Sequence, residues 1–184
     1  AAIPSFIGVV LIFLLREPRK TSQTAATKLP KQSVMRLPKQ LKLFLLASSL
    51  FALGNSSDSF LILRAGDLGL SLTLIILAYV AYNIVYSIAS VPAGKLADKL
   101  GSEKVFAVGI LLYVAVYLGF ALTNSQASVW GLFAVYGLYI AFTDGVSKAL
   151  VGQYIRHEEA GGVYGLLQTI TSVGILLASI VGGL

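Results

Sequence analysis

The chain has 184 residues, of which 57% are hydrophobic and only 12% are charged, and its mean hydropathy is +0.83. Soluble domains carry about 25% charged residues, so a water-soluble core of this size could not hide so much apolar surface. The composition therefore predicts an integral membrane protein in contact with lipid. The absence of cysteine excludes disulfides and thiol catalysis, and a single histidine, His157, argues against a metal cluster.

The first 42 residues divide into an apolar run and a basic stretch. In residues 1–15, AAIPSFIGVVLIFLL, the positive charges follow the apolar run instead of preceding it, unlike a signal peptide. We therefore interpret this run as the end of a truncated membrane span. Residues 16–42 contain eight Lys or Arg, one acid and three prolines without apolar periodicity, which predicts a solvated linker.

Five longer apolar runs follow the basic stretch. A helix of about 20 residues crosses a hydrocarbon core about 30 Å thick, and continuous apolar runs satisfy their backbone hydrogen bonds as helices. We expect an all-α membrane fold with short polar connections, so that successive helices are antiparallel neighbours. The expected helices cover residues 43–63, 72–93, 105–122, 129–151 and 163–184.

The placement of Lys and Arg predicts the orientation in the membrane. If the 16–42 linker is cytoplasmic, the alternation of helices also places 94–104 and 152–162 on that side. This arrangement collects every Lys and Arg except Arg64 on or near one side, as the positive-inside rule expects. A basic linker could instead bind nucleic acid or anionic lipid, but topology explains the charge, and we expect no nucleic-acid partner.

Polar residues interrupt the first complete span. Asn55, Asp58 and Ser59 share one helical face through their i, i+3 and i+4 spacing. Asp58 could pair with Arg64 or reach interfacial water. Alternatively, it lines a water-filled cavity as a proton or substrate group, because ionisable residues inside membranes are costly and mark transport pathways.

The second span carries Tyr79, Tyr82, Asn83 and Tyr86 in one broad stripe. A tyrosine pairs an apolar ring with a hydroxyl that needs a partner, so the stripe suits either the bundle interior or a substrate cavity. Packing is the more common role of such aromatic stripes. Asn83 favours a cavity, and we keep all four residues as candidates for it.

The fourth span contains two charges, Asp144 and Lys148, within an otherwise apolar or small run. Each charge alone would cost roughly 2.5–3.5 kcal/mol at the centre of a membrane helix. At i and i+4, with the acid first, the two side chains face each other in the favourable orientation. We therefore predict an ion pair near the cytoplasmic boundary, with a structural role at an inner gate as the simplest interpretation.

The segment GKLADKLGSEK, residues 94–104, resembles the signature loop between helices 2 and 3, repeated between helices 8 and 9, of the major facilitator superfamily. Ser102 and Glu103 stand where that signature has basic residues. The segment TDGVSKALVGQYIRHEEAGGVYGLLQT, residues 143–169, resembles the junction of helices 10 and 11 in bacterial drug-efflux members. The matching signature positions are Gly94, Leu96, Asp98, Lys99, Gly101 and Lys104.

The resemblance implies that the chain runs from the end of helix 6 to helix 11 of a 12-helix fold. Residues 1–15 would end helix 6, 16–42 would link two six-helix bundles, and 43–184 would form the C-terminal bundle, truncated before helix 12. In that family Asp98 would steady the inner gate against the N-terminal bundle. Asp98, Lys99, Asp144 and Lys148 are then gate candidates, and a small-molecule substrate would bind between the halves.

The function expected from the resemblance is secondary transport by alternating access, as proton-coupled efflux from a bacterial cytoplasmic (inner) membrane. A non-transporting scaffold, a receptor or an inactive remnant of a truncated gene is the alternative. An enzyme is not expected, because no Ser/His/Asp or metal-binding set lies in the spans. No cofactor or metal is expected, and the expected partners are lipid, a small-molecule substrate and the missing N-terminal bundle.

Overall fold

The computed structural model describes residues 37–54, 59–155 and 160–182. Every element in these ranges is an α-helix, and four of the helices are long and apolar enough to cross a membrane. The helices are α3 (Lys39–Gly54), α4 (Ser59–Asp67), α5 (Leu72–Leu100), α6 (Ser102–Leu122), α7 (Gln126–Tyr154) and α8 (Ala160–Gly182). These elements confirm the predicted all-α membrane class.

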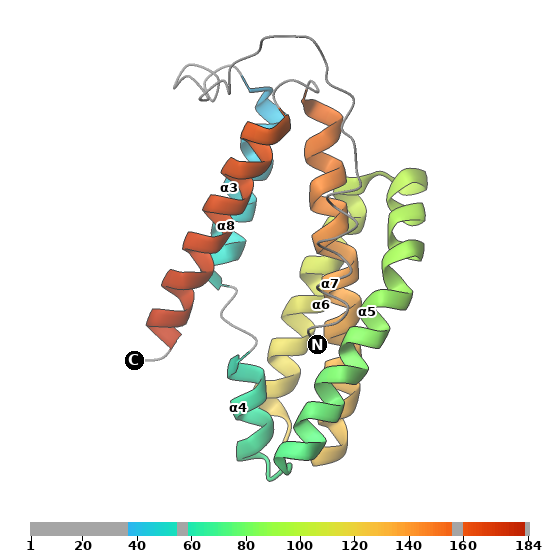
Figure 1. The fold of residues 1–184 in the computed structure, drawn as a ribbon, viewed down its shortest axis with the longest axis vertical. Coiled ribbons are helices and arrows are strands. Elements are labelled where there is room, and N and C mark those ends of the chain that lie inside the picture. The colour runs from blue at the N-terminus through green and yellow to red at the C-terminus, as the bar shows by residue number, and fades with distance from the viewer. Residues whose placement is uncertain (1–36, 55–58, 156–159, 183–184) are drawn as a thin grey trace, which may run out of the picture.

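The helices form two groups that lie side by side (Figure 1). One group contains α5, α6 and α7, and α7 packs against both of its neighbours. The other group is the pair α3 and α8, while α4 lies beside one end of α5. We refer to the two ends of the bundle by their turns, as the Gly69 end, where α4 meets α5, and the Gly101 end, where α5 meets α6.

Several helix boundaries differ from the predicted ones. The predicted span of residues 43–63 is described as two helices, α3 and α4, on either side of residues 55–58. Helix α3 begins at Lys39, within the predicted linker, because Leu37 and Leu41 are buried against Val163 and Leu167 of α8. Burial of these leucines favours helix over a solvated chain.

Helix α5 continues past the predicted end at residue 93 through the segment that was expected to be a loop. The connection to α6 is reduced to Gly101, whose φ of 96° lies in the region that favours glycine. Its backbone N–H donates to the carbonyl of Ala97 and so completes the end of α5. The chain reverses at Gly101, whereas Gly94 lies within the helix.

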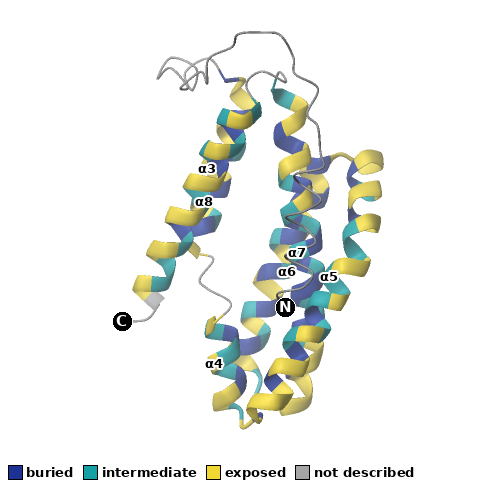
Figure 2. Ribbon diagram, in the orientation of Figure 1, coloured by how far each residue is buried: buried dark blue, intermediate teal, exposed yellow. Residues whose placement is uncertain are grey.

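Aromatic rings fill the interior between α5, α6 and α7. Tyr82 contacts Tyr136 with ring centroids 5.4 Å apart, and Phe120 contacts Phe133 at 5.5 Å. Phe51 extends this cluster to α3, because its ring lies 4.9 Å from that of Tyr113. The outer surfaces of the helices are largely exposed leucine, isoleucine and valine, as a lipid-facing surface requires (Figure 2).

At the Gly69 end, Arg64 joins two helices through hydrogen bonds. It is the one cation outside the positive-inside pattern. Its Nε donates to the carbonyl of Phe120 and its Nη2 to the carbonyl of Thr123, both at 3.2 Å. These carbonyls end α6, where a helix has unsatisfied acceptors and a partial negative charge. Arg64 therefore ties α4 to the end of α6.

Close helix contacts depend on glycine at three crossings. A Cβ added to Gly137 of α7 would lie 2.5 Å from the carbonyl oxygen of Tyr82, and one on Gly174 of α8 would lie 2.5 Å from Cβ of Ala52. Gly109 of α6 similarly faces Thr143. Small residues allow helix backbones to approach in lipid, where no hydrophobic force draws the helices together.

We predict that Gly137→Ala destabilises the bundle, because the methyl group would meet the backbone of α5. Overpacking of this kind costs about 1–3 kcal/mol. Gly131→Ala on the same helix is the matched control, since nothing lies within 4 Å of its added Cβ. Thermal unfolding in detergent should show a lower midpoint for Gly137→Ala than for Gly131→Ala. Equal midpoints would contradict the close crossing of α5 and α7.

Candidate functional site

A charged network joins α5 and α7 inside the bundle. Lys148 Nζ lies 2.8 Å from Asp144 Oδ1, which makes the predicted i, i+4 ion pair. The Tyr86 hydroxyl donates to the other carboxylate oxygen, Asp144 Oδ2, at 3.3 Å. Asp144, a predicted gate residue, thus receives one partner from its own helix and one from the stripe predicted to line a cavity.

The geometry of α7 sets the depth of this network. Helix α7 ends at Tyr154, so Lys148 lies about 9 Å before the end of the helix at 1.5 Å per residue. The pair is therefore deeper within the helix than a boundary near residue 151 would place it. The Asp144 side chain is 45% exposed and the Lys148 side chain is 56% exposed, so neither charge is fully buried.

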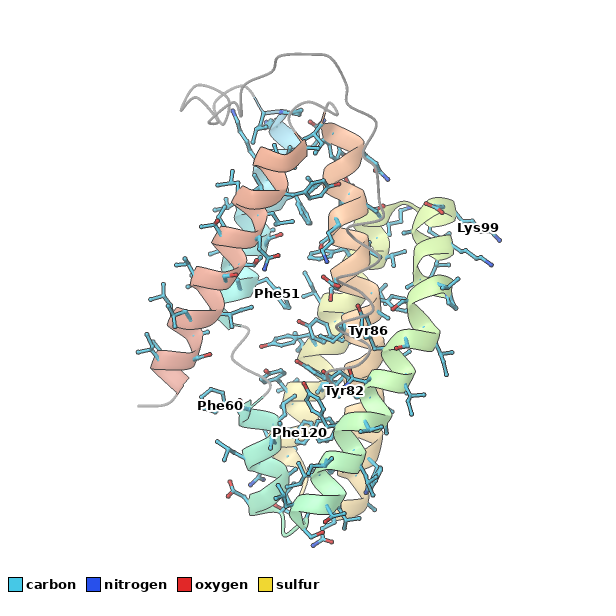
Figure 3. The ribbon with its side chains drawn as sticks, in the orientation of Figure 1. Phe51, Phe60, Tyr82, Tyr86, Lys99 and Phe120 are labelled. Atoms are coloured by element: carbon cyan, nitrogen blue, oxygen red, sulfur yellow. The ribbon has the colours of Figure 1, made fainter. Side chains whose placement is uncertain are left out.

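A cavity of about 290 Å³ opens beside the ion pair, between the α3–α8 pair and helices α6 and α7. We call it the inner cavity. Its apolar walls include Phe51, Phe106 and Ile140, and Figure 3 shows Phe51 projecting from α3 towards the other helix group. Its polar lining consists of Ser48, Thr143, Asp144, Ser147, Lys148, Gln168 and Thr171.

The predicted site did not include Ser48, Gln168 or Thr171 of this lining. Gln168 and Thr171 lie one turn apart on α8. Two polar residues at this spacing on an apolar helix share one face, and this pattern could have predicted a polar site there. Most hydroxyls here bond to their own helix, as Thr143 does to the carbonyl of Tyr139 and Thr171 to that of Leu167. Ser48 differs, since its Oγ is buried without a hydrogen-bond partner among the described residues.

The four residues of the predicted α5 stripe lie in different environments. Tyr82 is buried in the aromatic cluster, where its ring packs against Tyr79 and Tyr136. Tyr79 and Asn83 also border a shallow outer groove of about 460 Å³, formed by α5 alone with Ser87. The Asn83 amide donates to the carbonyl of Tyr79. Only Tyr86 of the four bonds to the charged network in the described structure.

Asn55 and Asp58 lie outside the described residues, as does His157. Their predicted roles therefore stay predictions. Next to them, Tyr113 of α6 donates a hydrogen bond of 2.5 Å to the carbonyl of Gly54, the last residue of α3. This bond satisfies an acceptor at the end of α3, so the aromatic cluster supports the helix where residues 55–58 begin.

The signature segment 94–104 lies at the Gly101 end. Asp98 borders a small cavity of about 170 Å³ between α5 and α7, with Tyr86, Ser90 and Gly145 also in its lining. The Asp98 side chain is exposed and has no hydrogen bond or ion pair with any part of the chain that the structure describes. Lys99 projects away from the bundle (Figure 3). Lys104 is exposed in the first turn of α6.

The two positions that depart from the signature, Ser102 and Glu103, contact the end of α7. Gln153 Nε2 donates to Ser102 Oγ at 3.1 Å, and the Tyr154 hydroxyl donates to Glu103 Oε1 at 2.9 Å. Glu103 also lies in the first turn of α6, where a negative charge is favourable. Here these residues fasten α6 to α7 within one bundle.

No group of three or more His, Cys, Asp or Glu among residues 37–54, 59–155 and 160–182 could hold a metal ion. What the site offers is an acid, a base, a phenol and a hydroxyl-lined cavity within a lipid-facing helical bundle. That combination defines a polytopic membrane protein with an internal polar site. Such sites in membranes bind or conduct polar solutes.

The chain belongs to the Major Facilitator Superfamily, whose sequence model matches residues 1–179. An MFS-type transporter of Methanocaldococcus jannaschii is 35% identical over 189 residues, which cover 100% of this chain and 47% of that protein. The multidrug resistance protein MdtH of Yersinia enterocolitica is 27% identical over 63% of this chain and 29% of its own length.

A multidrug transporter of Candida glabrata is 28% identical over 56% of this chain and 17% of its own length. The chain thus spans less than half the length of these curated relatives. No solved structure matches the chain. The family membership confirms the resemblance drawn from the signature segments.

We predict that Lys148→Met lowers stability more than the double substitution Asp144→Asn with Lys148→Met. The single variant leaves the carboxylate without its cation, whereas the double variant removes both charges. The coupling free energy should be about 1 kcal/mol, the scale of contacting charged pairs. Thermal unfolding of the wild type, both single variants and the double variant measures it. Additive midpoint shifts would show that the pair contributes no stability.

Proposed function

We propose that this chain is the C-terminal half of a secondary transporter that exports small organic molecules by alternating access in exchange for protons. The observation that carries the proposal is the Tyr86–Asp144–Lys148 network beside the inner cavity. Charged groups inside a membrane bundle are expensive, and they persist where they serve a solute or ion pathway. Multidrug names among the relatives support small organic molecules as the substrate class.

The membrane orientation follows from the position of the cations. All Lys residues in the described ranges lie on helix segments towards the Gly101 end, while Arg64 lies near the Gly69 end. We infer that the Gly101 end, with the signature segment and the 16–42 linker, faces the cytoplasm of a cytoplasmic membrane. The exposed carboxylate of Asp98 would then be placed at the inner gate.

The outer groove of α5 supports a contact with a second bundle. Tyr79, Asn83 and Ser87 lie along a surface of α5 on which no other described helix packs. Polar groups of a membrane helix normally face protein or a water-filled space instead of lipid. We infer that this face meets the N-terminal bundle and borders the pathway between the two halves.

The full gene provides the first test of this assignment. The coding sequence on both sides of residues 1–184 should contain about five further spans upstream, a second signature segment and a twelfth helix downstream. A stop codon or unrelated sequence on either side would contradict a complete transporter. The remaining assignment would then be a scaffold or remnant, in which the charged pair serves packing alone.

We predict that Asp98→Asn in the complete protein lowers transport at least tenfold while membrane insertion and the thermal midpoint stay unchanged. The reason is that its carboxylate has no partner in the described bundle and so acts towards the other half. Flux in reconstituted liposomes measures the effect. Asp67→Asn is the charge-matched control, since Asp67 is exposed at the Gly69 end. Unchanged flux in Asp98→Asn would remove Asp98 from the gate.

A second prediction concerns Asp58 as a proton carrier. Asp58→Asn should abolish proton-driven net flux but spare the exchange of labelled for unlabelled substrate, because exchange needs no net proton movement. Liposomes with and without a pH gradient separate the two activities, again with Asp67→Asn as the control. If both activities persist in Asp58→Asn, Asp58 carries no protons and its role is structural.

A further inference from the structure

We propose that the inner cavity binds a small zwitterion of the amino-acid type, with its ammonium on Asp144, its carboxylate on Lys148 and an apolar side group among the aromatic walls. This inference rests on the proposed function, because it names the substrate class of a transport site. It depends on two features of the cavity: its charges are one acid and one base already in contact, and it contains a buried hydroxyl without a partner.

Solutes of different charge differ in whether they leave Asp144 or Lys148 without a counter-charge. Among the described residues that line the cavity, Asp144 is the only acid and Lys148 the only base. A cation bound to Asp144 would leave the Lys148 ammonium without a counter-charge. An anion bound to Lys148 would leave the Asp144 carboxylate without one. Loss of the counter-charge is unfavourable for either group, although the half exposure of both side chains lowers the cost. A zwitterion replaces both partners at once, so the ion pair favours it over a cation or an anion.

The groups that would receive such a solute still have hydrogen-bonding capacity. The Lys148 ammonium has three donors, and its one recorded partner in the described structure is Asp144. The carboxylate accepts from Lys148 on one oxygen and from Tyr86 on the other, which leaves lone pairs on both. Tyr86 holds the carboxylate from the α5 side, so it can stay in place when Lys148 turns to a ligand.

Ser48 is the independent sign that the cavity takes a polar ligand. Its side chain lines the cavity from α3, is only 4% exposed, and has no hydrogen-bond partner within the described ranges. Serines in membrane helices usually bond to their own backbone, as Ser90 does to the carbonyl of Tyr86. A buried hydroxyl without a partner is costly, and a ligand carboxylate or ammonium would satisfy it once the side chain turns towards the cavity.

The volume and the apolar walls of the cavity indicate the size of the solute and the nature of its side group. Ligand sites commonly have volumes of about 300–1,000 Å³, so a cavity of about 290 Å³ suits a compact molecule. Phe51, Phe106 and Ile140 supply an apolar surface next to the charges. This combination fits a single apolar side group attached to a zwitterionic head, as in leucine or phenylalanine.

The test is a binding series on the complete protein purified in detergent, measured by calorimetry at pH 7. The probes share one ring but differ in charge: phenylalanine is a zwitterion, phenethylamine a cation, 3-phenylpropionate an anion and N-acetylphenylalaninamide neutral. Leucine serves as a second zwitterion. We expect at least one of the two zwitterions to bind at least tenfold more tightly than the cation, the anion and the neutral compound.

Single-charge variants should reverse the selectivity. Asp144→Asn leaves Lys148 alone and should favour 3-phenylpropionate, whereas Lys148→Met should favour phenethylamine. The exchanged pair, Asp144→Lys with Lys148→Asp, keeps both charges and should restore the preference for the zwitterion even if a single variant fails to fold. Ser48→Ala should weaken zwitterion binding about fivefold or more without lowering the thermal midpoint, because no described interaction is lost.

Thr169→Ala is the matched control on α8, since Thr169 is exposed and does not line the cavity. The proposal is overturned if neither zwitterion binds at millimolar concentration, if all charge types bind equally, or if the exchanged pair keeps no preference. Flux is measured separately in liposomes. Zwitterion binding without flux would refute the transport function alone, and flux of other solutes without zwitterion binding would refute this inference alone.

Discussion

The close packing of α7 against its neighbours is the constraint on which the rest of the structure depends. In lipid, helices gain little from hiding apolar surface, so they associate through close contact and hydrogen bonds. Gly137 lets the backbone of α7 meet that of α5, and Gly109 lets α6 approach Thr143 on another face of α7. Because α7 is held from two sides, it carries the charged pair at a defined position.

Most polar groups in the bundle are held by a contact from a second helix or by their own backbone, and Ser48 is an exception among the described residues. Arg64 of α4 donates a hydrogen bond to a carbonyl at the end of α6, and Tyr113 of α6 donates to the last carbonyl of α3. Tyr86 of α5 donates to the Asp144 carboxylate on α7. These bonds cross between helices that are far apart in sequence. They fix helix positions in an environment where water cannot compensate for a missing partner.

The gate and the cavity, which the sequence suggested as separate sites, are connected through Tyr86. Its hydroxyl bonds to Asp144 and its side chain also borders the small cavity that Asp98 lines. Asp144 in turn lines the inner cavity on the other side of the network. Tyr86 therefore links the small cavity that Asp98 borders to a residue that lines the inner cavity.

Sequence alone determined the membrane class, the number of long apolar runs and the Asp144–Lys148 pair, because hydropathy and i, i+4 spacing are local properties of a helix. It did not determine that α5 continues through Leu100, since charged residues at a helix end resemble a loop when the turn is a single glycine. Nor could it place Ser48 and Lys148 in the lining of one cavity, Tyr82 in the core, or Tyr86 in a hydrogen bond to Asp144. Those positions depend on how α3, α5 and α7 cross, and only tertiary packing decides which face of a uniformly apolar helix points inwards.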